Sequence, residues 1–172
     1  MRLRCVVGAG LLLAIVSGGQ LPARAGEAPI EVRVELPKID YQVGETITFT
    51  VTANRDCNFL VYTIDPNGKV ELHDPVVSGA YMGHPLLKAG EHRQIPAPDA
   101  PGRAVVTPPG GRYEIGAVCS RHDLDKLGMS RVQLKEPAMG GRRSFQFHLD
   151  ERAKSIDRDN LARVTVAYEV KD

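Results

Sequence analysis

The stretch that decides the fold is R-D-C-N-F-L-V-Y-T-I-D-P-N-G-K-V-E-L, residues 55–72. Residues 58–64 are mostly apolar on both faces, which is typical of a strand in the interior of a sheet. Asp65-Pro66-Asn67-Gly68 favours a tight turn, because proline fixes φ and Asn-Gly tolerates positive φ. Residues 69–73 then alternate with a period of two. The stretch therefore predicts a β-hairpin, with Cys57 close to its start.

Strand-like patterns recur on both sides of this hairpin, and turn signals separate them. Residues 30–36 alternate apolar and charged side chains, and residues 46–52 place apolar side chains opposite threonines. In residues 142–149, Phe145, Phe147 and Leu149 also recur with a period of two, which predicts a strand. Further strands are expected at residues 86–90, 92–96, 103–107, 113–120 and 163–170, and short helical segments at 121–127 and 150–160.

About eight or nine short strands with little helix favour an all-β protein. The specific expectation is an immunoglobulin-like antiparallel β-sandwich with one or two short helices in its C-terminal third. The chain contains no tryptophan, so the tryptophan that packs on the disulfide of true immunoglobulin domains is missing.

The N-terminus has the pattern of a secretory signal peptide. A positive start at residues 1–4 precedes an apolar run at residues 6–16 and a small-residue pair, Ala23 and Ala25. We expect cleavage after Ala25, which leaves residues 26–172 as a single β-sandwich domain. The alternatives are an uncleaved membrane anchor and a buried N-terminal helix. With no second long apolar run, the mature protein is expected to lack a membrane span and to be periplasmic or secreted.

Charge argues against nucleic acid as a partner. The predicted leader holds three arginines and no acidic residue, so 19 of the 22 basic residues remain against 21 acidic ones. The mature chain also lacks a long basic tract and a basic amphipathic helix. Nucleic-acid binding and a role at the membrane surface therefore lose their electrostatic basis.

Of the three cysteines, Cys57 and Cys119 lie beyond the predicted signal peptide. In an exported protein two such cysteines most often form a disulfide, although two separate buried thiols are the alternative. The intervening loop is long, so the chain-entropy model gives the bridge about 4 kcal/mol of stabilisation. A bridge between two facing sheets, as in immunoglobulin domains, would suit the expected sandwich. No C-x-x-C pair supports a zinc site.

A set of weak motifs becomes specific through its order along residues 36–122. The motifs are Tyr41-x-x-Gly44-Glu45-x-Ile47-x-Phe49, Phe59-Leu60-Val61-Tyr62, Asp65-x-x-Gly68-x-Val70-x-Leu72, Leu87-x-Ala89-Gly90, Ile95-Pro96, Pro109-Gly110-Gly111 and Ala117-Val118-Cys119-Ser120. In this order they resemble the bacterial exported domain of unknown function 4384. The resemblance implies a small β-sandwich in a cell-envelope protein, with an accessory or ligand-binding role. The sequence departs from the family pattern at His73-Asp74-Pro75, and the family pattern supplies no catalytic residues.

Histidines give a possible metal or small-ligand site. His73, Asp74, His84 and His92 fall in one loop-rich region, and imidazole and carboxylate groups are ligands for transition metals. The chain has no H-x-H, H-x-x-H or H-x-x-x-H spacing, so surface histidines on loops are the plainer interpretation. No cofactor is predicted.

Catalysis is not expected. Ser120, His122 and Asp123 are the residue types of a hydrolase triad, but a triad is assembled from separated segments and these are adjacent. The chain also has no G-x-S-x-G motif. Cys119 lies in an apolar strand, where a bridged or buried cysteine is expected rather than a reactive one.

The sequence therefore predicts an exported, non-catalytic accessory or binding module of the bacterial cell envelope. Its partner would be a protein or a glycan, contacted by the long loops at residues 74–85 and 121–143, because functional contacts gather on long loops over a rigid sheet. The alternative is a periplasmic protein that binds a small ligand or metal through His73, Asp74, His84 and His92.

Overall fold

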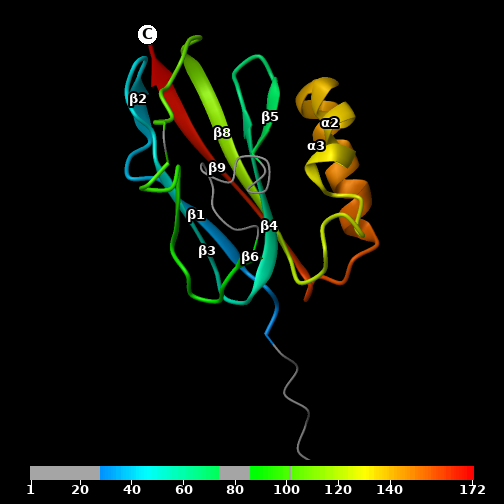
Figure 1. The fold of residues 1–172 in the computed structure, drawn as a ribbon. Helices are drawn as coiled ribbons and strands as arrows, with labels where there is room; N and C mark the ends of the chain where they lie inside the picture. The colour runs from blue at the N-terminus through cyan, green and yellow to red at the C-terminus, as the bar shows by residue number, and fades with distance from the viewer. Residues whose placement is uncertain (1–27, 74–85, 101) are drawn as a thin grey trace, which may run out of the picture.

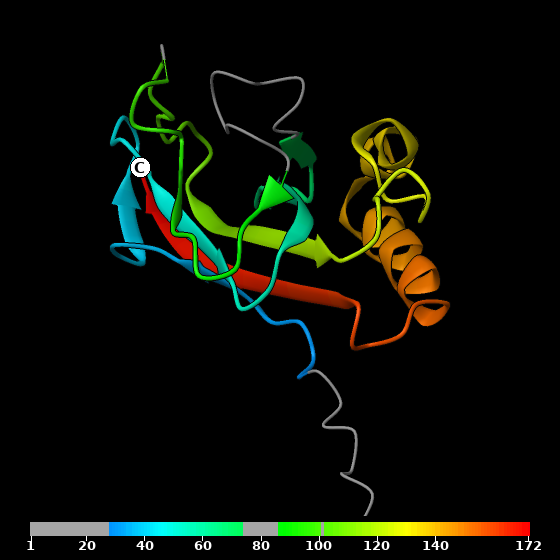
Figure 2. The same ribbon diagram turned by 60° about the horizontal axis from the view of Figure 1, so that its bottom comes forward.

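The computed structural model describes residues 28–73, 86–100 and 102–172. Two β-sheets face each other, and two helices cover the outer face of the larger sheet (Figure 1). The turned view shows the helices on one side of this sheet and the smaller sheet on the other (Figure 2). The predicted β-rich, sandwich-like architecture is confirmed, and the helices add a third layer to it.

The smaller sheet has three antiparallel strands in the order β1-β3-β7. These strands are β1 (Val32–Glu35), β3 (Phe49–Ala53) and β7 (Arg93–Ile95). Burial alternates along β1, because its valines face the core and its charged residues face solvent. The alternating pattern of residues 30–36 thus predicted both the strand and its buried face.

The larger sheet has the order β2-β9-β8-β4-β5, with β6 paired to the start of β4. Its strands are β2 (Asp40–Gln42), β4 (Cys57–Ile64), β5 (Val70–His73), β6 (Leu86–Leu87), β8 (Gly111–Ser120) and β9 (Leu161–Lys171). The sheet is mixed, since β2 runs parallel to β9 and the other pairs are antiparallel. The C-terminal strand therefore lies inside the sheet, between β2 and β8.

The hairpin predicted from residues 55–72 is formed by β4 and β5. Ile64 lies opposite Val70, and the main chain closes the turn with a 3.0 Å hydrogen bond from Asp65 N to Lys69 O. Gly68 has a φ of 82°, which residues with a side chain rarely adopt. The Asn-Gly signal therefore predicted this turn for the right physical reason.

Cys57 and Cys119 form a disulfide, with 5.6 Å between their Cα atoms. The predicted pairing is confirmed, but its predicted position between two facing sheets is wrong. The two cysteines belong to β4 and β8, which are neighbours in the larger sheet, with Phe59 directly opposite Cys119. Cys57 is two residues from Phe59, so the bridge is a diagonal link on one sheet face.

Strand β4 contributes to two separate cores, which explains why it is apolar on both faces. Phe59 and Val61 point from the inner face into the core between the sheets. Leu60, Tyr62 and Ile64 point from the outer face into a second core beneath the helices. The alternation of a strand thus places consecutive residues in different cores.

The prediction of a strand at residues 142–149 is wrong, because this segment lies in helix α3 (Gly141–Lys154). Phe145 and Leu149 are four residues apart, so they share a helix face and are both buried, whereas the side chain of Phe147 is 60% exposed. Helix α2 (Arg131–Met139) was not predicted, and it contains Pro137.

Two smaller differences concern the strand list. Residues 40–42, for which no strand was predicted, form β2. Residues 103–107 contribute only an isolated bridge between Val105 and Thr46 rather than a strand. None of the helices within the described residues is long and apolar enough to span a membrane.

The helical layer is fixed to the larger sheet at two places. The Arg142 main-chain N–H donates to Gly68 O at 2.7 Å, and the Arg142 side chain pairs with the buried carboxylate of Glu114 on β8. Further along, the Tyr62 ring covers Gly116, meets Phe145 edge-on with 4.8 Å between ring centroids and bonds Thr165 through its hydroxyl at 3.1 Å. These specific contacts hold the helices against the outer face.

Candidate binding pocket between the sheets

A pocket with a volume near 290 Å³ lies between the two sheets, where the larger sheet ends at β5. Its floor is the inner face of the larger sheet, and its opposite wall comes from Phe49, Ile95 and residues 104–108. Four strands of the larger sheet and two of the smaller sheet contribute side chains that line it. The pocket is therefore formed by regular structure rather than by loops alone.

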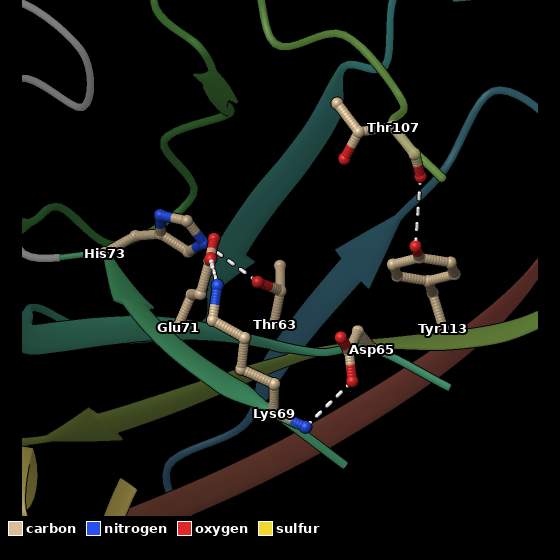
Figure 3. A network of polar contacts seen from close by, with 7 residues as sticks. All are labelled: Thr63, Asp65, Lys69, Glu71, His73, Thr107 and Tyr113. Carbon is tan, nitrogen blue, oxygen red and sulfur yellow. Dashed lines mark hydrogen bonds and ion pairs between the residues drawn. The ribbon is translucent and has the colours of Figure 1, made fainter. Parts of the chain in front are cut away.

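Polar side chains gather along one side of this pocket, at the end of β4 and along β5 (Figure 3). We call this group the polar ledge, and it consists of Thr63, Asp65, Lys69, Glu71 and His73. The strand register creates it, because Thr63 lies opposite Glu71 and the period of two gives Glu71 and His73 the same face. The intervening residues of β5 face the helices instead.

Hydrogen bonds order the polar ledge. Thr63 Oγ1 and His73 Nε2 share a hydrogen bond of 3.1 Å, and the Lys69 main-chain N–H donates to Asp65 Oδ1 at 2.8 Å. The Lys69 ammonium lies 2.6 Å from Glu71 Oε1. The hydrogen bond from Lys69 lowers the pKa of Glu71 below its ordinary value, and the same bond raises the pKa of Lys69.

Two aromatic side chains, Tyr113 on β8 and Tyr168 on β9, also line the floor. Tyr113 and Tyr168 stack with 5.4 Å between ring centroids, and Tyr41 meets Tyr168 edge-on at 5.5 Å. The Tyr113 hydroxyl donates to the carbonyl oxygens of Thr107, at 3.1 Å, and Pro109, at 2.9 Å. This contact ties the opposite wall to the floor (Figure 3).

Tyr168 differs from Tyr113 in the hydrogen bonding of its hydroxyl group. Its side chain is only 7% exposed and lines the pocket, and its hydroxyl has no hydrogen-bond partner in the part of the chain that the structure describes. Burial raises the pKa of Tyr168 well above the ordinary tyrosine value, so the phenol stays neutral at physiological pH. The hydroxyl is available there as a donor or acceptor.

The predicted histidine site is only partly described. His73 lines the pocket, whereas His92 is exposed next to β7 and is not among the lining residues. Asp74, His84 and the predicted cleavage residue Ala25 lie outside the described residues. Within residues 28–73, 86–100 and 102–172, no three His, Cys, Asp or Glu side chains are grouped to hold a metal ion.

Ser120, His122 and Asp123, whose residue types match a hydrolase triad, lie at the end of β8 and just beyond it. The hydroxyl of Ser120 is fully buried and accepts a 3.0 Å hydrogen bond from the main-chain N–H of His122. The prediction of a long loop at residues 121–143 is wrong for its second half, because residues 131–143 form α2 and the start of α3. Residues 74–85, the other loop expected to bind a partner, lie outside the described residues.

Sequence reasoning missed Tyr113, Tyr168 and Glu71 as pocket residues. A signal existed in the alternation of K-V-E-L-H at residues 69–73, which places Glu71 and His73 on one face of a strand. Which face pointed into the sandwich depended on the position of the helices, and the sequence predicted only short helical segments at residues 121–127 and 150–160.

Comparison with protein families gives a match over residues 40–123 to the domain of unknown function DUF4384. This segment belongs to the DUF4384 family. The resemblance drawn from residues 36–122 is therefore confirmed. The DUF4384 segment runs from β2 to just beyond β8 and supplies the residues that line the pocket except Tyr168, which comes from β9.

Other comparisons add little to the family assignment. A search of curated proteins gave no match. Among solved structures, the fold is similar to Spo0M, a sporulation control protein from Bacillus subtilis, at 12% sequence identity and a TM-score of 0.38. The alignment covers 85% of this chain and 51% of that chain, so this protein spans about half the length of Spo0M.

Proposed function

We propose that this protein is an exported accessory module of the bacterial cell envelope that binds a protein or glycan partner and carries out no chemistry itself. The observation that carries this proposal is the pocket between the sheets, with its apolar wall and its polar ledge. Ligand sites are typically concave and largely apolar, with a few well-placed polar groups. The leader pattern at residues 1–25 and the disulfide support an oxidising, exported location.

In vivo photo-crosslinking tests this proposal. A benzophenone amino acid is placed at Thr107, which is exposed beside the pocket, and at Val132, which is 83% exposed on α2. We expect a discrete cross-linked partner from position 107 and none from position 132. Equal labelling at both positions, or no product from either, would contradict the pocket as the contact site.

Export is tested separately on the protein from the periplasmic fraction. We expect its N-terminus to be Gly26, as cleavage after Ala25 requires. Full-length protein that stays in the cytoplasm would refute the envelope part of the proposal.

The immunoglobulin-like character of the sandwich is also a proposal. Two facing sheets that share one apolar core support it. The disulfide within a single sheet differs from the bridge between sheets in immunoglobulin domains.

Binding of a metal or small ligand through His73, Asp74, His84 and His92 is the second candidate. The observation that favours it is the position of His73 on the pocket floor. Metal analysis of the native protein tests it, together with thermal shifts on addition of zinc or copper. A metal-free protein with no shift would remove this candidate.

A further inference from the structure

We propose that the pocket binds a lysine or arginine side chain of a partner protein, with the aliphatic stem on the apolar wall and the cationic head at the polar ledge. The inference rests on the proposed binding function and narrows the partner to a protein with an exposed basic residue. Four features of the pocket support it.

The first feature is size and polarity. A volume near 290 Å³ is at the lower end of the range of about 300–1,000 Å³ for small-molecule sites, which suits a side chain. Phe49, Ile95 and Ile115 are buried at its apolar side, whereas the side chain of Glu71 on the ledge is 56% exposed. Lysine and arginine have the matching shape, with an apolar stem and a charged end.

The second feature is the charge around the ledge. Asp65 and Glu71 both line the pocket, and one carboxylate oxygen of Asp65 has no partner within the described chain. Burial raises the pKa of Tyr113, and the negative charges of Asp65, Asp172 and Glu71 raise it further. The Tyr113 hydroxyl therefore lies in a negative potential, which favours a cationic ligand.

The third feature is Lys69, a cation of the protein itself that already sits on the ledge. Its ammonium lies 2.6 Å from Glu71, while its side chain is 69% exposed. Exposed ion pairs of this kind are weak, so a partner cation can replace Lys69 at little cost. Lys69 is then a competitor of the ligand, and its loss should strengthen binding.

The fourth feature is the hydroxyl of Tyr168. Tyr168 lines the pocket, and its hydroxyl makes no hydrogen bond within the described chain, so the hydroxyl can bond a ligand that enters. An ammonium or guanidinium has several N–H donors, and the phenol oxygen can accept from one of them.

The opposite reading is an anion site that uses Lys69 and His73. A cationic and an anionic ligand predict opposite changes in affinity for the same substitutions. For a cationic ligand, Glu71→Gln weakens binding and Lys69→Gln strengthens it, whereas an anionic ligand reverses both effects.

The experiment is a titration of the exported, purified protein, followed by NMR. The probes are the capped peptides Ala-Ala-Lys-Ala-Ala, Ala-Ala-Gln-Ala-Ala and Ala-Ala-Glu-Ala-Ala, which differ only at the central residue. We expect the lysine peptide to shift the resonances of Tyr113 and Tyr168. Glu71→Gln should weaken its binding about two- to fivefold and Lys69→Gln should strengthen it by a similar factor.

Lys154→Gln is the matched control, because Lys154 forms an exposed ion pair with Glu151 on α3, outside the pocket. It should leave the affinity unchanged. Equal shifts from all three peptides, stronger binding of the glutamate peptide or no shift from the lysine peptide would overturn the inference. If the Thr107 cross-link is nevertheless present, the proposed function stands and only the cationic ligand is refuted.

Discussion

The two faces of the larger sheet differ in what covers them. The outer face packs against α2 and α3, and its aromatic contacts leave the Tyr62 ring where a Cβ on Gly116 would lie. The inner face packs against a smaller sheet of three strands and has a polar pocket at its β5 end. Strand β4 belongs to both faces, so the difference arises from what covers each face rather than from separate parts of the chain.

This difference separates stability from binding. A face that packs apolar side chains closely against other elements gains stability from that packing. A face that keeps charged side chains beside apolar ones provides a surface for a partner. We therefore expect large losses of stability from changes on the outer face and at the disulfide, and small losses from changes on the polar ledge.

Phe145→Ala should have the largest effect. Phe145 is fully buried between the helices and the sheet, and removal of a buried phenylalanine side chain costs about 3–5 kcal/mol. Phe147→Ala is the control, since that side chain is largely exposed and its loss should change stability by less than about 0.5 kcal/mol. Urea unfolding of both variants measures the difference, and equal losses would mean that the two rings share a buried face, as in a strand.

Replacement of both Cys57 and Cys119 by alanine should have the next largest effect. The bridge spans 62 residues of sequence, and removal of such a link lowers the free energy of unfolding by about 2–4 kcal/mol. Urea unfolding measures this loss. The native protein should also have a mass lower by two hydrogen atoms than its reduced form. Free thiols in the native protein would refute the bridge.

Arg142→Met should have an intermediate effect. The change leaves the carboxylate of Glu114 buried without its partner, which is unfavourable for a charge in a poorly solvated place. Because the Arg142 side chain is about half exposed, we expect a loss of about 1–2 kcal/mol rather than the full value for a buried pair. Arg143→Met, the neighbouring exposed arginine, is the control and should unfold like the wild type in urea.

The sequence predicted the strands well where local signals and burial agreed. The alternation of residues 30–36 and the turn at residues 65–68 depend on neighbouring residues, and both are confirmed. Helix α2 and most of α3 were missed, and the short helical segment expected at residues 150–160 overlaps only the end of α3. Phe145-x-Phe147-x-Leu149 imitates a strand, while Phe145, Leu149 and Ala153 at spacings of four form the true helical stripe. Helix α2 contains Pro137, a residue that disfavours a helix interior, so this helix depends on its tertiary contacts.

The pocket could be predicted only in part. His73 was a candidate from its residue type, and it does line the pocket. Tyr113 and Tyr168 meet because β8 and β9 pair in a register that places them directly opposite. That register joins segments far apart in the sequence, and no short motif records it. A site made by strand pairing therefore needs the topology before its residues can be recognised.

Glu71→Gln should have the smallest effect on stability and thereby separates the polar ledge from the scaffold. The Lys69 hydrogen bond lowers the folded-state pKa of Glu71 below its ordinary value of 4.5, so the pair stabilises the protein above that pH. This contribution disappears as the pH falls through the folded-state pKa. Because both side chains are more than half exposed, we expect the melting temperature at neutral pH to fall by no more than about 2 °C. The wild type and the variant should converge in acid. A fall as large as that of Arg142→Met would show that the ledge is part of the scaffold, and would remove the distinction between the two faces.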